Sequence, residues 1–261
     1  MKQIDLTGKT AVVTGGAGKI GRALCCALAD CGASVAICYY SKEDYAHQLQ
    51  DELTKKYSRP FLAVQADVTN RDSVVAMKKT VNSSLGDVSI IINNAVIHGI
   101  EWLSVLEQDA AAYHSQFESG VMQAVNMAQI FTPDMIAKQY GRIIGINSEC
   151  AMQMFPYQSA YVSGKRGMDG VYRILAKEVG KHNITVNQVA PGWTITHENR
   201  NPDPAASNIK QDFPYVSIVP MGRRGTDEEI ANAVCFLASD LATFITGVYL
   251  PVCGGGVMPC I

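Results

Sequence analysis

The sequence has almost no net charge, few aromatic residues and no long apolar run. Its 22 basic and 24 acidic residues leave a formal net charge of −2 at pH 7. This balance gives no electrostatic reason to expect nucleic acid or an acidic membrane surface as a partner. No apolar run reaches the roughly 18 residues that a membrane-spanning helix needs, so we expect no membrane partner. The segment Met1–Gly8 contains an acid where a signal peptide has its apolar stretch, and secretion is therefore not expected.

Paired cysteine motifs are also missing, although the chain has eight cysteines. No C-x-x-C pair occurs, and the five histidines have no ligand spacing. We therefore expect neither a disulfide framework nor a metal site. We interpret the cysteines as reduced thiols that pack as small hydrophobic side chains in a cytoplasmic protein.

Apolar strand-like runs alternate with longer helix-like runs along the 261 residues. Continuous apolar strands that are each followed by a helix are typical of a parallel sheet covered on both faces. We therefore predict a single doubly wound α/β domain over residues 1–261, with a mostly parallel seven-stranded sheet. The predicted strands are Thr10–Thr14, Ser34–Tyr39, Phe61–Gln65, Val88–Ile92, Arg142–Ile146, Thr185–Val189 and Val248–Val252. The predicted helices are Ile20–Cys31, Glu43–Tyr57, Arg71–Leu85, Asp109–Gln139, Ser159–His182 and Asp227–Ala238.

One long stretch breaks this alternation. Residues 194–220 are rich in asparagine, proline and serine and have no clear periodicity. A connection of this length in a compact domain is usually functional, and this one follows a strand end, where ligands bind in open α/β sheets. We interpret residues 194–220 as a substrate lid, and a tolerated surface insertion is the alternative.

A glycine-rich turn follows the first predicted strand and precedes a helix. Gly16, Gly18 and Gly21 match the pattern G-x-G-x-x-G in that setting. Glycines let the backbone approach a pyrophosphate, and the N-terminus of the helix supplies the positive end that a phosphate needs. The turn therefore predicts a dinucleotide cofactor. The expected contacts in this turn are Gly15, Gly16, Gly18, Lys19, Ile20 and Gly21.

The order of motifs resembles the short-chain dehydrogenase/reductase family of the classical type. Thr14, Gly15 and Gly21 match the family's T-G-x-x-x-G-x-G turn, with Lys19 at the middle glycine. Further matches are Asp67-Val68, Asn93-Asn94-Ala95-Val96, Ser148, Tyr161, Lys165, Pro191-Gly192, Thr196, Ile245-Thr246-Gly247 and Gly254-Gly255. The resemblance covers nearly the whole chain. It implies a Rossmann fold, a nicotinamide cofactor, and interconversion of a ketone and a secondary alcohol by hydride transfer.

Four positions depart from the family pattern. Lys19, Val96 and Cys253 replace common residues, and Gly120 stands where the family has an Asn in the helix before the fifth strand. We expect Gly120 to leave room for a water molecule or for substrate near Lys165. These departures leave open a non-catalytic dinucleotide-binding or scaffold protein. A dehydratase or epimerase that uses the same residues also stays open.

Ser148, Tyr161 and Lys165 are the predicted catalytic residues. Tyr161 and Lys165 are four residues apart on a predicted helix, so their side chains share one face. We expect the ammonium, helped by the charge of the bound nicotinamide, to lower the pKa of the phenol from about 10 toward about 7, which makes Tyr161 the acid or base. Ser148 is expected to donate a hydrogen bond to the substrate oxygen. The resemblance implies that Lys165 also holds the nicotinamide ribose.

No carboxylate stands at the end of the second predicted strand, where an acid would bind the ribose of NAD. Tyr39 is there, and Ser41 and Lys42 follow it. With Lys19, these residues favour the 2′-phosphate of NADP(H), and NAD(H) is the alternative. The other cofactor contacts that the resemblance implies are Asp67, Val68, Asn94, Ala95, Tyr161, Lys165, Pro191, Gly192, Thr194 and Thr196.

The expected substrate pocket lies after Ser148 and under the lid. Phe155 and Trp193 predict apolar contacts, and Glu149 and His98 predict recognition of a hydroxyl group. The expected partner is a small-molecule carbonyl or alcohol. A sugar, a cyclic polyol, an oxoacyl thioester and a polyketide ketone all stay open. The resemblance also implies a homo-oligomer, a dimer or a tetramer, paired through the two longest helices.

Overall fold

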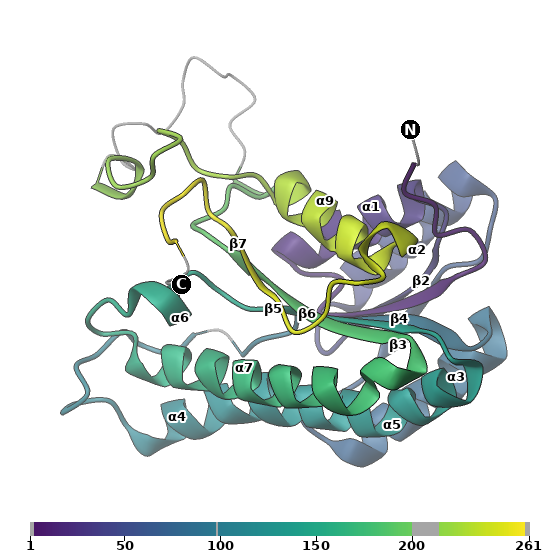
Figure 1. The fold of residues 1–261 in the computed structure, drawn as a ribbon, viewed down its shortest axis with the longest axis horizontal. Coiled ribbons are helices and arrows are strands. Elements are labelled where there is room, and N and C mark those ends of the chain that lie inside the picture. Colours follow the sequence, from purple (N-terminus) through teal and green to yellow (C-terminus); the bar gives the residue numbers. More distant parts are fainter. Residues whose placement is uncertain (1–2, 98, 200–213, 259–261) are drawn as a thin grey trace.

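The computed structural model describes residues 3–97, 99–199 and 214–258. In this part of the chain, helices cover both faces of one central sheet (Figure 1). The sheet has seven strands in the order β3-β2-β1-β4-β5-β6-β7, and every neighbouring pair is parallel. The predicted doubly wound Rossmann fold is confirmed, and the sheet is parallel throughout rather than mostly parallel.

The elements lie close to their predicted positions. The strands are β1 (Thr10–Thr14), β2 (Ser34–Tyr39), β3 (Leu62–Gln65), β4 (Val88–Asn93), β5 (Gly141–Ile146), β6 (Ile184–Pro191) and β7 (Tyr249–Val252). The helices are α1 (Lys19–Asp30), α2 (Glu43–Tyr57), α3 (Arg71–Leu85), α4 (Ala110–Phe117), α5 (Gln123–Lys138), α6 (Cys150–Gln153), α7 (Ser159–Val179) and α9 (Asp227–Ala238). Short 3-10 turns cover Gly180–His182 and Asp240–Ala242. The sequence did not predict the short helix α6.

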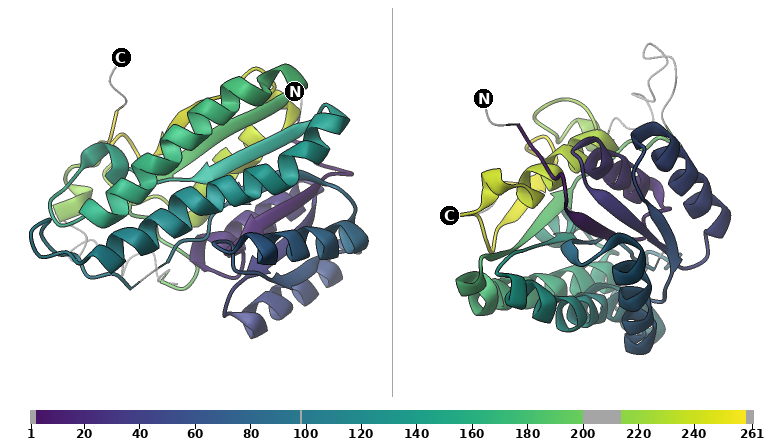
Figure 2. Two further views of the ribbon diagram at one scale, coloured as in Figure 1. Left: turned by 90° about the horizontal axis from the view of Figure 1, so that it is seen from below. Right: turned by 90° about the vertical axis from the view of Figure 1, so that its right-hand side faces the viewer.

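Two hydrophobic cores lie on the two faces of the sheet. Helices α1, α2 and α9 cover one face, and α3, α5 and α7 cover the other (Figure 2). Successive residues of β4 alternate between them, because Ile90 and Ile92 belong to the first core and Ile91 to the second. Burial on both faces explains why the strands appear in the sequence as continuous apolar runs.

The predicted helix Asp109–Gln139 is helical along its length but changes kind in the middle. A π-helical turn, Glu118–Met122, separates α4 from α5. Gly120 lies in this turn, and a Cβ on it would stand 3.1 Å from the carbonyl oxygen of Gly164 in α7. The prediction that Gly120 leaves room for water or substrate is therefore wrong, because the backbone of α7 lies in that space. The glycine instead allows two helices to approach closely.

The chain order along the sheet reverses between β1 and β4. Such a reversal opens a crevice outside the carboxyl ends of the strands, where open α/β sheets bind ligands. Most of the expected lid, residues 200–213 of 194–220, lies outside the described residues. In the part of the chain that the structure covers, no helix is both long and apolar enough to cross a membrane.

Candidate active site

The glycine turn between β1 and α1 lies at this crevice. Gly15 has a φ of +62°, in the left-handed region that favours glycine. A Cβ on Gly21 would stand 2.0 Å from the carbonyl oxygen of Gly15, so no larger residue fits without a shift of the backbone. Gly18 precedes the first turn of α1. The backbone N–H groups of that turn have no hydrogen-bond partner within the helix. The turn can therefore hold a phosphate, and the residues present fit a dinucleotide.

Side chains from β1, from α5 and from the residue after β4 fix this turn. The Nδ2 of Asn94 donates to the carbonyl oxygens of Thr14 at 2.9 Å and Gly15 at 3.2 Å. The hydroxyl oxygen of Thr14 accepts from the amides of Asn94 at 2.9 Å and Ala95 at 3.0 Å, and the hydroxyl donates to Gln123 at 2.6 Å. No sequence pattern predicted a role for Gln123, because it is one of several polar residues in α5.

Lys19 and Lys42 meet at one carboxylate. Glu198 lies 3.6 Å from the Nζ of Lys19 and 3.8 Å from the Nζ of Lys42, and all three side chains are partly exposed. An anion therefore already occupies the space between the two cations. Ser41 is exposed nearby, whereas Tyr39 is buried in the core.

The segments after β3 and β6 are held by local hydrogen bonds. The carboxylate of Asp67 accepts from the amide of Thr69 at 2.9 Å, and Val68 is buried beside it. After Pro191 ends β6, the hydroxyl of Thr194 donates to the carbonyl oxygen of Gly192 at 2.8 Å. The amide of the buried Thr196 donates to Asn199 at 2.6 Å.

Ser148, Tyr161 and Lys165 come together at the carboxyl end of β5. Ser148 follows the strand, and the other two residues lie on one face of α7. The Nζ of Lys165 donates to the carbonyl oxygen of Ile146 at 2.7 Å and lies 5.6 Å from the centroid of the Tyr161 ring. The structure thus brings the three predicted catalytic side chains to one place.

Burial governs the acidity of both groups on α7. It raises the pKa of Tyr161 to about 12, and a hydrogen bond with Ser148 opposes this rise. Burial lowers the pKa of Lys165 to about 8. The expectation that Lys165 makes Tyr161 more acidic is therefore wrong for the protein by itself. Both groups lose water, and the ammonium donates to a carbonyl oxygen rather than to the phenol.

A cavity of about 570 Å³ opens beside these residues. Its lining includes Ser148, Tyr161 and three of the expected substrate contacts, namely Glu149, Phe155 and Trp193. Glu149 is buried, and burial raises the pKa of its carboxyl group. The fourth expected contact, His98, lies outside the described residues.

Two further aromatic residues line this cavity. The ring of Trp102 stands edge-on to that of Tyr161, with 5.8 Å between the centroids. Tyr215 packs against Trp193 at 5.5 Å, and its hydroxyl oxygen accepts from the Trp193 amide at 2.9 Å. Neither residue was predicted from the sequence. Trp102 lies in an irregular segment and Tyr215 in a single helical turn within the aperiodic stretch 194–220, where no pattern predicts what a side chain will contact.

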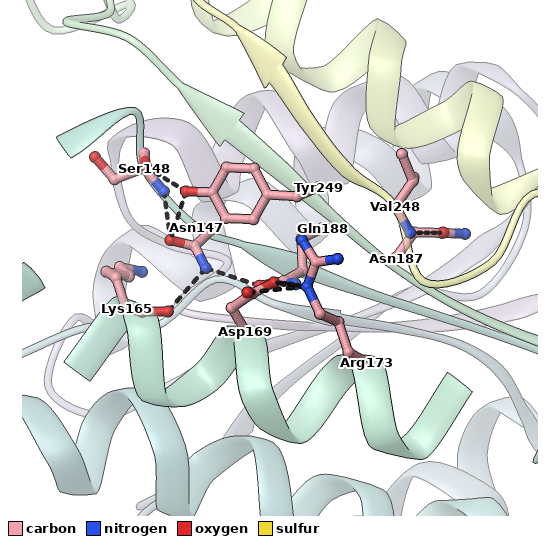
Figure 3. Close-up of polar contacts among 9 residues, drawn as sticks. All are labelled: Asn147, Ser148, Lys165, Asp169, Arg173, Asn187, Gln188, Val248 and Tyr249. Atoms are coloured by element: carbon pink, nitrogen blue, oxygen red, sulfur yellow. Dashed lines mark hydrogen bonds and ion pairs between the residues drawn. The ribbon is translucent and has the colours of Figure 1, made fainter. Parts of the chain in front are cut away.

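Behind the cavity, Asn147 connects the backbones of two predicted catalytic residues (Figure 3). Its Nδ2 donates to the carbonyl oxygen of Lys165 at 3.0 Å, and its Oδ1 accepts from the amide of Ser148 at 2.9 Å. Gln188 and Tyr249 also bind this side chain. No sequence pattern predicted a role for any of these three residues.

Comparison with known proteins points to one family. A family model described as enoyl-(acyl carrier protein) reductase matches residues 15–256. The chain is 34% identical over 250 residues to 3-oxoacyl-(acyl-carrier-protein) reductase FabG of Staphylococcus aureus, covering 96% of this chain and 98% of that protein. It is 31% identical over 260 residues to 2,3-dihydroxy-2,3-dihydro-p-cumate dehydrogenase of Pseudomonas putida, with coverages of 98% and 96%.

A solved structure agrees with these sequence matches. A 7α-hydroxysteroid dehydrogenase complexed with NADH and 7-oxo glycochenodeoxycholic acid superposes with a TM-score of 0.88 and 28% identity, over 99% of each chain. The protein therefore belongs to the short-chain dehydrogenase/reductase family. It is an oxidoreductase that acts on CH–OH or C=O groups with NAD(P).

Proposed function

We propose that this enzyme interconverts a ketone and a secondary alcohol, with Tyr161 as the acid or base and with Ser148 and Lys165 assisting. One observation carries the proposal. Ser148 and Tyr161 line the same cavity, and the buried ammonium of Lys165 lies directly behind the Tyr161 ring. When bound, the nicotinamide supplies or accepts the hydride.

The three side chains divide the remaining work. In reduction, the carbonyl carbon gains the hydride while the phenol of Tyr161 gives its proton to the oxygen, and oxidation reverses both transfers. The Ser148 hydroxyl donates to the same oxygen as negative charge develops on it. Once its proton has left, the phenolate is stabilised by the cation of Lys165, which the protein already holds 5.6 Å from the ring centroid.

For the cofactor, we favour NADP(H) with its pyrophosphate at the N-terminus of α1. Lys19 and Lys42 support this preference, because the carboxylate of Glu198 already lies between them and a 2′-phosphate would take its place. NAD(H) is the alternative, since the similar 7α-hydroxysteroid dehydrogenase is complexed with NADH. The fixed glycine turn and Asn94 serve either cofactor.

The substrate that we propose is a small carbonyl or alcohol compound with an apolar body and a further polar group. Trp102, Phe155 and Trp193 offer aromatic walls, and Glu149 offers a buried carboxyl group. Two relatives are named for a 3-oxoacyl-(acyl-carrier-protein) and for a dihydrodiol of p-cumate, and the similar solved structure contains 7-oxo glycochenodeoxycholic acid. A substrate panel should therefore contain one compound of each class.

The test is turnover of this panel with NADPH and with NADH, followed by absorbance. Tyr161→Phe should lower turnover by about a thousandfold, because the proton donor is lost. Tyr140→Phe is the matched control, since it removes a phenol whose partner is Asp240. Full activity of Tyr161→Phe contradicts the mechanism. Nucleotide binding without turnover of any compound favours the non-catalytic alternative. A product that has lost water favours a dehydratase, and a product with an inverted stereocentre favours an epimerase.

We further propose a cytoplasmic homo-oligomer. Phe117 of α4 and Ile174 of α7 are 48% and 57% exposed, and such apolar side chains favour a partner on these helices. The cysteines that the structure describes are free thiols, which supports a reducing compartment. Sedimentation as a monomer would contradict the assembly.

A further inference from the structure

Asn147 uses its full hydrogen-bonding capacity inside the protein. Its two amide hydrogens go to the carbonyl oxygen of Lys165 at 3.0 Å and to Oε1 of Gln188 at 2.7 Å. Its oxygen accepts from the amide of Ser148 at 2.9 Å and the hydroxyl of Tyr249 at 3.1 Å (Figure 3). An amide side chain has two donor hydrogens and two acceptor lone pairs. Any rotation of Asn147 therefore breaks several bonds at once.

Asp169 sets the direction of these hydrogen bonds. Its carboxylate can only accept, and it accepts from Nε of Arg173 at 2.8 Å and from Nε2 of Gln188 at 2.7 Å. The oxygen of Gln188 must then face Asn147, and the oxygen of Asn147 must face Ser148. One charged group thus decides which end of each amide points toward the predicted catalytic residues.

Tyr249 closes the network from the neighbouring strand. It is the register partner of Gln188 across β6 and β7. The single proton of its hydroxyl is shared between the carbonyl oxygen of Ser148 at 2.5 Å and Oδ1 of Asn147 at 3.1 Å, and the shorter contact is the one to Ser148. Both peptide groups of Ser148 are therefore held by side chains, its amide by Asn147 and its carbonyl by Tyr249.

We propose that Asn147 and Tyr249 are positioning residues that hold Ser148 and Lys165 in fixed relation to each other. This inference rests on the proposed function of those two residues. Neither Asn147 nor Tyr249 is among the residues that line the cavity, so their contribution passes through the backbone. The hydroxyl of Ser148 matters most as charge develops on the substrate oxygen, and its displacement therefore reduces rate more than binding.

Tyr249→Phe tests the inference with the loss of one hydroxyl. We expect kcat to fall about tenfold, the effect of one lost hydrogen bond, with the KM for the cofactor unchanged within about twofold. The hydrogen bond from Ser148 lowers the pKa of Tyr161. A displaced Ser148 should therefore move the acidic limb of kcat for alcohol oxidation to higher pH. Tyr140→Phe, at the other end of the sheet, should leave kcat and its pH profile unchanged.

A second variant, Asn147→Asp, turns an acceptor toward the Lys165 carbonyl oxygen and should lower kcat further than Tyr249→Phe. If Asn147→Asp does not fold, Tyr249→Phe still decides. If Tyr249→Phe keeps the wild-type kcat and pH profile, the inference is overturned. It is also overturned if Tyr140→Phe lowers kcat as much as Tyr249→Phe does. An active Tyr161→Phe overturns the proposed function itself, whereas an inactive Tyr161→Phe beside a fully active Tyr249→Phe overturns this inference alone.

Discussion

Two cations are buried at opposite ends of strand β5, and their surroundings differ. Arg142, near the start of the strand, is 0% exposed, and Lys165, beside the last residue of the strand, is 5% exposed. Arg142 pairs with Asp240 at 3.0 Å and also donates to the carbonyl oxygens of Gly141 and Asn183. Lys165 donates to the carbonyl oxygen of Ile146. In the described part of the chain, no carboxylate forms an ion pair with Lys165.

The difference separates a structural charge from a reactive one. A buried charge is costly unless it is paired, and an arginine stays charged at every pH that a protein survives. Arg142 therefore needs Asp240, whereas the unpaired Lys165 responds with a pKa lowered to about 8. The carboxyl end of a parallel sheet is where ligands bind. An unpaired cation at that end is thus kept available for a ligand or a developing charge.

The strongest test of this contrast is Lys165→Met. We expect kcat/KM to fall by about a thousandfold, because the phenolate of Tyr161 loses its neighbouring cation. The melting temperature should not fall, since a buried charge without a carboxylate gives way to an apolar chain of similar length. Turnover and thermal unfolding measured on one preparation check both parts. More than a tenth of the wild-type activity would contradict the role of Lys165.

Arg142→Met should show the opposite pattern. We expect the free energy of unfolding to fall by about 2–4 kcal/mol, because buried carbonyl oxygens lose their donor. Activity per folded molecule should stay at the wild-type level. Urea titration measures the loss, and Arg22→Met is the control because its ion pair with Glu52 is partly exposed and should cost less than about 1 kcal/mol. If Arg142→Met and Arg22→Met lose the same free energy of unfolding, the buried Arg142 has no special structural role and the contrast with Lys165 fails.

The pH dependence of stability gives a third test. The pKa of Lys165 is about 8 in the folded chain and has an ordinary value of 10.5 in the unfolded one. Between these values the unfolded chain binds more protons, so Lys165 makes stability rise with pH across this window. The raised pKa of Tyr161 acts in the opposite direction above pH 10. Urea titrations of wild type and Lys165→Met at pH 7.5 and 10 should differ in this rise by about 2 kcal/mol. If the free energy of unfolding changes with pH equally in wild type and Lys165→Met, the pKa of Lys165 is not lowered in the folded chain.

The smallest effect is expected where cations are exposed. Glu198→Gln should free Lys19 and Lys42 and tighten NADPH binding about two- to fivefold, the size of an exposed ion pair. The affinity for NADH should not change, because NADH has no 2′-phosphate that could bind to Lys19 and Lys42. Fluorescence titration with both cofactors measures the difference, and Glu178→Gln, a substitution of an exposed acid in α7, is the control. Equal tightening for both cofactors would place the 2′-phosphate elsewhere.

The sequence alone predicted features that depend on neighbours in the chain. The continuous apolar runs predicted the strands, and the spacing of Tyr161 and Lys165 predicted their shared helix face. The π-helical turn at Gly120 was not predicted, and the close approach of Gly120 to the backbone of Gly164 involves another helix that no local pattern describes. In the protein without its cofactor, the pKa of Tyr161 is raised rather than lowered, because its burial depends on elements far away in the chain.

The amino-acid sequence by itself determined the doubly wound fold, the glycine turn and the identity of the predicted catalytic side chains. The fold follows from hydrophobic periodicity, the turn follows from the conformational freedom of glycine, and the catalytic side chains follow from motifs that resemble those of the family. Tertiary structure alone decided how those side chains are held and charged. Asn147 and Tyr249 are 102 residues apart yet share a hydrogen bond, and the burial of Lys165 arises from strands and helices that meet only on folding. Desolvation and long-range contacts are properties of the packed molecule, and no local pattern carries them.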